Sequence, residues 1–73
     1  MVSLVDVGSP DALGRAVRDR RRELGITQDD LAGFSGVGRR LIIEIEAGKP
    51  TVRLDKLLVV LHGLGLRLQV APK

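Results

Sequence analysis

Cysteine is absent from the 73-residue chain, and histidine and the aromatic residues occur once each, as His62 and Phe34. Disulfide bonds and thiolate metal ligands are therefore excluded, and one histidine cannot form a metal site unaided. No nucleophile–base pair can be assembled, because His62 is expected at the exposed end of a helix. These absences predict a protein that is not an enzyme and uses no metal or cofactor. The lack of cysteine also suits a reducing cytoplasm.

The chain also lacks aromatic platforms and long apolar runs. Proteins that read single strands or RNA stack bases on several aromatic side chains, so this class is disfavoured. No apolar run approaches the roughly 18 residues of a membrane span, and no basic segment precedes an apolar run at the N-terminus. We therefore expect neither a membrane partner nor a signal peptide. What the chain does have is a net charge of +3 and a pI near 10.2, which suits nucleic acid or an acidic partner.

The short length of the chain limits the stability that a single copy can reach. With 73 residues there is room for one small domain. A domain of this size buries only about 60% of its unfolded surface and is marginally stable alone. Since disulfides and metals are excluded, oligomerisation is the remaining support, and a homodimer is favoured.

The N-terminal third predicts one helix, which follows a short apolar segment. Residues 1–8 do not alternate cleanly and form either a tail, which we favour, or a short edge strand. Ser9 is a suitable N-cap and Pro10 suits the first helical position, so a helix is predicted over residues 10–24, with Gly25 as its left-handed cap. The side chains expected to face the core are Leu13, Val17 and Leu24.

The middle of the chain predicts two short helices around a glycine-containing turn. Thr27 opens the first of them in a capping box with Asp30, and Gly36 ends it. Gly38 is a permissive N-cap for the second, over residues 39–47. This is the pattern of a helix-turn-helix, whose second helix lies in the DNA major groove. The inward side chains expected on the first of these helices are Leu31, Ala32 and Phe34.

The C-terminal third predicts a last helix and then a strand. Thr51 is the expected cap of a helix that carries a leucine stripe and ends near Gly63. Residues 64–70 then alternate with period two, which is typical of a half-buried strand. A lone strand cannot satisfy its backbone, so we expect it to pair with the same strand of a second copy; pairing with residues 2–7 is the alternative. The side chains predicted for this dimerisation strand are Leu64, Leu66, Leu68 and Val70.

Together these elements predict a mainly α fold with a C-terminal β-strand that pairs across a dimer. The predicted divisions are an N-terminal tail or short strand (1–8), a DNA-binding helix-turn-helix domain (9–63), and a dimerisation strand and tail (64–73).

The outward face of the predicted recognition helix suggests how DNA would be read. Arg40 is expected to bind guanine, Arg39 guanine or a phosphate, and Gln28 a phosphate. Glu44 either accepts from cytosine or, as we prefer, orients Arg40 across one helical turn. Ile43 either touches a thymine methyl group or is incidentally exposed. The predicted DNA-contacting residues are Gln28, Gly38, Arg39, Arg40, Ile43, Glu44 and Lys49.

Two charged residues fall on faces that should be buried. Arg21 lies in the apolar stripe of the first helix, and Glu46 lies on the core face of the recognition helix. Buried charges need partners, so the two are predicted to form an ion pair that joins these helices.

Several dipeptides resemble the Cro/repressor-type (xenobiotic-response-element) helix-turn-helix family over residues 13–68. They are Thr27-Gln28, Leu31-Ala32, Gly36-Val37, Ile45-Glu46 and Gly48-Lys49. Residues 36–68 are more similar still to the HipB-like antitoxins of type II toxin–antitoxin operons. The chain departs from the family at Gly38, where serine is usual, and in the apolar Leu41 and Ile43 of the recognition helix.

The resemblance implies a lambda-repressor-like domain of four helices. It implies a homodimer on double-stranded palindromic operator DNA, with recognition helices about 34 Å apart. It further implies a strand swapped across the dimer, a HipA-like kinase toxin as partner, repression of the protein's own operon, and a cytoplasmic, nucleoid-associated location. The alternatives are a stand-alone regulator without a toxin, or a protein-interaction module that has lost DNA binding and exposes Leu41 and Ile43.

Overall fold

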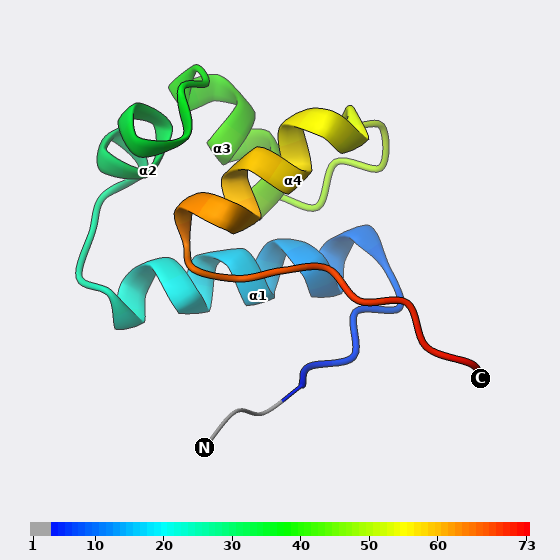
Figure 1. Ribbon diagram of the computed structural model, residues 1–73. Coiled ribbons are helices and arrows are strands. Elements are labelled where there is room, and N and C mark those ends of the chain that lie inside the picture. Colours follow the sequence, from blue (N-terminus) through cyan, green and yellow to red (C-terminus); the bar gives the residue numbers. More distant parts are fainter. Residues whose placement is uncertain (1–3) are drawn as a thin grey trace.

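A computed structural model describes residues 4–73 of the chain. Helices make up all the regular structure in this range: α1 (Pro10–Glu23), α2 (Gln28–Ser35), α3 (Arg39–Glu46) and α4 (Leu54–Gly63) (Figure 1). The mainly helical fold, with four helices and a helix-turn-helix at α2 and α3, is therefore confirmed. None of these helices is both long and apolar enough to cross a membrane.

The helix starts follow their predicted caps in three of the four cases. Ser9 accepts a hydrogen bond from the backbone of Ala12 at 3.1 Å. Thr27 and Asp30 form both bonds of a capping box, at 2.9 and 3.0 Å. Gly38 precedes α3 without a side-chain bond, as glycine must.

The predicted start of α4 is wrong. The N-cap is Arg53 and not Thr51, and the helix begins at Leu54. Val52 packs against the core and keeps the preceding residues in the loop. Arg53 also pairs with Asp55 at 2.7 Å, and the first turn begins two residues later than expected.

All four helices end in the same way, with a glycine in the left-handed region just past the last turn. Their φ values are 68° at Gly25, 68° at Gly36, 81° at Gly48 and 70° at Gly65. After α3, the backbone of Lys49 donates to Glu44 and that of Gly48 to Ile45, both at 3.0 Å, which is a Schellman motif. These ends make the connections short and reverse the chain sharply.

The core lies where the four helices meet. Gly14 of α1 lies against the last turn of α3, where a side chain would collide with the carbonyl oxygens of Ile45 and Glu46. Gly63 of α4 similarly lies against Ser35 of α2. The buried apolar residues are Val17, Leu31, Ala32, Ile42, Ile45, Leu57, Val60, Leu61 and Leu64.

Two side chains predicted to face the core are exposed. Phe34 is 68% exposed because the buried face of α2 is centred between Leu31, Ala32 and Ser35, about 100° away around the helix. Leu24 is 44% exposed because α1 ends at Glu23, so Leu24 no longer continues the helical stripe.

The predicted C-terminal strand is also wrong: residues 64–73 contain no strand. Leu64 caps α4 and is buried in the core of its own chain, and Gly65 then turns the backbone. Leu66 occupies the position after the Schellman glycine and packs against the core. The period-two alternation therefore reflects a helix end and not a sheet. Of the four side chains predicted for the dimerisation strand, only Leu68 and Val70 are exposed, at 42% and 96%, and could contact a partner.

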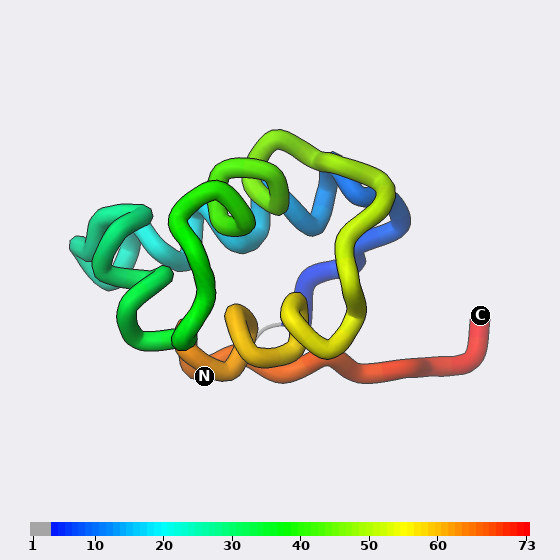
Figure 2. The backbone as a smooth tube through the Cα atoms, turned by 90° about the horizontal axis from the view of Figure 1, so that it is seen from above, coloured from blue at the N-terminus to red at the C-terminus, as the bar shows by residue number. Residues whose placement is uncertain are grey.

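The C-terminal segment continues in extended form toward the N-terminal end of α1 (Figure 1). Leu68 and Val7 line one apolar hollow there, together with Leu13 and Leu57. Seen from above, this segment follows the edge of the molecule formed by α4 and lies away from α3 (Figure 2). The side of the fold that carries α3 is thus separate from the side that carries the C-terminal segment.

Candidate nucleic-acid interface

Helix α3, the predicted recognition helix, is amphipathic, and its inner face packs into the core. Ile42 is fully buried and Ile45 is 3% exposed. On the opposite face Arg40 and Ala47 are exposed, and Ile43 is 42% exposed. Leu41 packs against the core, so the predicted apolar surface on this helix is reduced to Ile43 alone.

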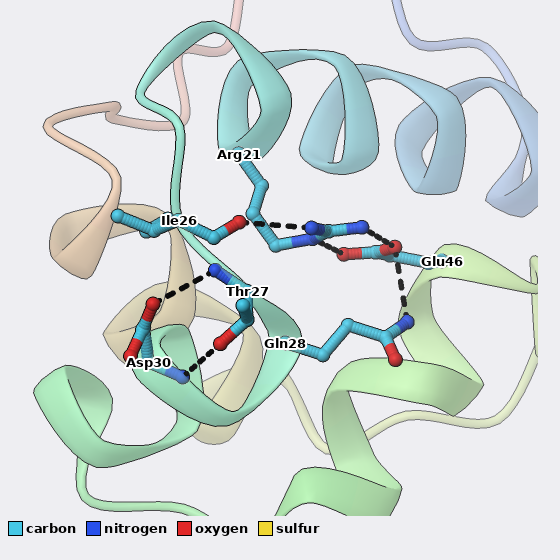
Figure 3. A network of polar contacts seen from close by, with 6 residues as sticks. All are labelled: Arg21, Ile26, Thr27, Gln28, Asp30 and Glu46. Carbon is cyan, nitrogen blue, oxygen red and sulfur yellow. Dashed lines mark hydrogen bonds and ion pairs between the residues drawn. The ribbon is translucent and has the colours of Figure 1, made fainter.

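A buried ion pair orients α3 against α1, as predicted. Arg21 Nε donates to Glu46 Oε2 at 2.8 Å and Arg21 Nη2 to Glu46 Oε1 at 3.1 Å (Figure 3). The two side chains are only 12% and 4% exposed. Hydrogen bonds to Glu46 raise the pKa of Arg21, and a further bond to the Ile26 carbonyl at 2.9 Å uses a third donor. Both charges are therefore satisfied, and their role is structural.

Gln28 takes part in this network instead of pointing to solvent. Its Nε2 donates to Glu46 Oε1 at 3.2 Å (Figure 3). The side-chain amide predicted to bind a phosphate thus also connects the start of α2 to the end of α3. The backbone at this end of α2 opens into a shallow hollow that Gln28, Asp29 and Arg39 line together.

The N-terminal end of α3 brings one basic side chain near a carboxylate that was not anticipated. Arg39 Nε lies 3.5 Å from Asp29 Oδ1 of α2, and both side chains are well exposed, at 60% and 73%. No sequence signal marks this pair, because it depends on how α2 and α3 cross.

The C-terminal end of α3 carries a second ion pair, and it differs from the predicted one. Glu44 was expected to orient Arg40, but Lys49 Nζ donates to Glu44 Oε2 at 2.7 Å. This bond holds the pKa of Glu44 below its ordinary value of 4.5, with a smaller contribution from the charge of Arg40. The Schellman turn at Gly48 brings Lys49 back over α3. In the described part of the chain, Arg40 makes no ion pair.

Arg20 has a structural role that the sequence did not reveal. Its Nε donates to the carbonyl of Leu64 at 3.0 Å. This bond caps the end of α4 from α1 across 44 residues of sequence, a relation that local spacing cannot show. Residues 4–73 hold no group of three or more His, Asp or Glu side chains placed to bind a metal ion.

The sequence matches a known family model over most of its length. The model is described as Helix-turn-helix and matches residues 17–70. The chain belongs to the helix-turn-helix family.

Two relatives in this family carry similar names. An uncharacterised HTH-type transcriptional regulator of Sinorhizobium fredii, y4mF, is 44% identical over 64 residues, which cover 88% of this chain and 84% of the relative. An uncharacterised HTH-type transcriptional regulator of Haemophilus influenzae is 38% identical over 61 residues, covering 84% and 62%.

Solved HipB structures share this fold, as the sequence resemblance implied. A complex of a HipB variant with an O2 20mer has a TM-score of 0.87 at 26% identity and covers 96% of this chain and 97% of HipB. A complex of HipA, HipB and O2-O3 gives 0.87 at 25% identity, covering 94% and 97%. The resemblance to the HipB-like members of the helix-turn-helix family is thereby confirmed.

Proposed function

We propose that this helix-turn-helix protein is a sequence-specific repressor that binds double-stranded operator DNA and controls its own operon. The observation that carries the proposal is the outward face of α3, where Arg40 is exposed and makes no ion pair with any of residues 4–73. A bidentate arginine contact to guanine is worth roughly 1–3 kcal/mol of discrimination. The Arg21–Glu46 pair supports this role because it holds the helix at a defined angle. In this proposal the protein has no enzymatic activity of its own.

In this proposal, three of the remaining predicted DNA contacts are kept. Arg39 and Gln28 would bind phosphates at the start of α3, where Gly38 allows the DNA backbone to approach. Ile43 would lie against a thymine methyl group. Glu44 and Lys49 lie together at the other end of the helix.

We further propose a homodimer on a palindromic operator. One α3 offers too few base contacts for the roughly 4–10 kcal/mol of specificity that such proteins have. The dimer would bury the exposed apolar face of α4 together with the end of the C-terminal segment. Apolar groups exposed there are Leu54, Leu58, Val59, Leu68 and Val70.

The proposal also includes a toxin as a protein partner. HipB has been solved in complex with 20mers and with HipA. By analogy we propose a HipA-like kinase as the partner of this chain, and a cytoplasmic, nucleoid-associated location. Copurification of a tagged chain with the product of the neighbouring reading frame tests this, and a neighbour unrelated to kinases would leave a stand-alone regulator.

A protein-interaction module without DNA binding is the competing function. Its support is weaker than the sequence suggested, because Leu41 packs inward and only Ile43 remains apolar and exposed on α3. A mobility shift with DNA from upstream of the protein's own reading frame separates the two. A shift that random duplex cannot compete away is expected for the repressor, and its absence would favour the interaction module.

A further inference from the structure

The basic side chains at the two ends of α3 are already neutralised within the chain. Lys49 is hydrogen-bonded to Glu44 at 2.7 Å, and Arg39 lies 3.5 Å from Asp29. Among residues 4–73, Arg40 is the basic side chain of this surface that has no such carboxylate. The surface proposed to face DNA therefore carries little net positive charge outside Arg40.

We infer that Glu44 is a specificity-determining residue that holds Lys49 away from DNA phosphates and so weakens binding to non-cognate DNA. This inference rests on the proposed DNA-binding function and deepens it. Non-specific affinity comes from cations that neutralise phosphates irrespective of sequence. A cation that is already paired within the protein adds less to that affinity, whereas the base contact of Arg40 is unaffected.

Three structural facts single out Glu44 rather than Asp29 as the stronger restraint. The Glu44–Lys49 contact is a short hydrogen-bonded ion pair, whereas the Asp29–Arg39 contact is longer. Glu44 is 29% exposed and Asp29 is 73% exposed, so solvent screens the first pair less. The backbone of Lys49 is also bound to the Glu44 carbonyl at 3.0 Å, which limits how far Lys49 can move away.

The charge state of Glu44 at neutral pH agrees with this role. Since the hydrogen bond from Lys49 lowers its pKa, the carboxylate is ionised throughout the neutral range. The nearby charge of Arg40 acts in the same direction.

The experiment measures the affinity of the full chain for a random-sequence duplex and for its promoter duplex over a range of salt concentrations. Glu44→Gln removes the charge and keeps the shape. If it frees Lys49 for one more phosphate, the slope of log K against log salt steepens by about 0.9. That corresponds to a roughly threefold larger loss of affinity between about 50 and 200 mM salt. Random-duplex affinity at low salt is expected to rise severalfold, and the preference for promoter DNA to fall correspondingly.

Glu23→Gln is the matched control, because it removes the same charge at the C-terminal end of α1, where Glu23 pairs with Arg20. Asp29→Asn is expected to have a smaller effect than Glu44→Gln. The double variant Glu44→Gln/Lys49→Gln is expected to return to the wild-type slope, because the gain depends on Lys49. Circular dichroism melting of each variant confirms that the fold is kept.

Two results would overturn the inference. One is a Glu44→Gln slope equal to that of Glu23→Gln. The other is a gain that persists in the double variant, which would mean that the carboxylate acts by repulsion and not by holding Lys49. A wild-type chain that binds neither duplex would instead refute the proposed DNA-binding function, so the two failures are distinguishable.

Discussion

At the scale of single residues, the most consequential contact is between two charges that lie where apolar side chains would be expected. Arg21 and Glu46 sit on the facing stripes of α1 and α3 and are almost completely removed from water. Their pairing could be predicted from the sequence because helical periodicity alone puts both on buried faces. The partners of Arg39, Lys49 and Arg20 could not, because they depend on how the helices cross and on a backbone turn.

Removing one member of the buried pair is expected to destabilise the domain strongly. Glu46→Ala leaves the Arg21 guanidinium buried without a carboxylate, which costs about 3–5 kcal/mol of unfolding free energy. Urea denaturation followed by circular dichroism measures this, since the chain has no Trp or Tyr for fluorescence. Replacing both residues by methionine should recover much of the loss. A loss below about 1 kcal/mol for Glu46→Ala would place the pair among ordinary surface ion pairs.

At the scale of elements, adjacent residues predict most helix boundaries correctly, but they mispredict the start of α4 and the segment that follows its end. The caps at Ser9, Thr27 and Gly38 were predictable because each depends on a few adjacent residues. The alternation after Leu64 predicts a strand wrongly, because a Schellman turn also places apolar residues two apart. The position of Leu64 in the core, which distinguishes the two cases, is a tertiary property.

The capping box of α2 gives a prediction at this scale. Thr27→Ala is expected to lower the unfolding free energy by about 1 kcal/mol, because the backbone N–H of Asp30 loses its acceptor. Thermal or urea unfolding by circular dichroism measures the loss, with Thr51→Ala as a control, because Thr51 is exposed and is not the N-cap of α4. An unchanged midpoint would show that the start of α2 is held by tertiary packing alone.

Asp30 adds a pH dependence to the same cap. The hydrogen bond from the Thr27 backbone lowers the pKa of Asp30 below its ordinary value of 3.8. A lowered folded-state pKa means that the carboxylate stabilises the fold above that ordinary value. This contribution is lost as the pH falls through the folded-state pKa. Urea midpoints should therefore fall in acid below about pH 4, and less steeply in Asp30→Asn. Equal slopes for the two proteins would contradict the assignment.

At the scale of the whole molecule, the separation of surfaces matters most. The α3 side carries the candidate DNA contacts, and the side formed by α4 and the C-terminal segment carries exposed apolar groups (Figure 2). The small size of the chain is enough to predict a dimer from the sequence. The dimer surface could not be predicted correctly, because Leu64 is buried in the core and Leu66 packs against it.

The proposed dimer can be tested with a pair of equally exposed residues. Leu58 on α4 is 43% exposed and Ile43 on α3 is 42% exposed. Leu58→Glu is expected to give a folded monomer by sedimentation velocity, because a charge would be buried in the proposed interface. Ile43→Glu should leave the dimer intact. Dissociation by both variants or by neither would contradict the assignment of the α4 surface.

The central claim is that α3 reads DNA sequence through Arg40, and a competition binding assay tests it most directly. Labelled promoter duplex is bound by the protein and competed with unlabelled promoter or random duplex. The wild type is expected to prefer its promoter by about a thousandfold or more. Arg40→Ala should lose at least roughly tenfold of that preference while its melting temperature stays unchanged. Arg15→Ala removes the same charge from an exposed position of α1. This variant should keep the preference. An Arg40→Ala protein that still discriminates as the wild type does would contradict the account.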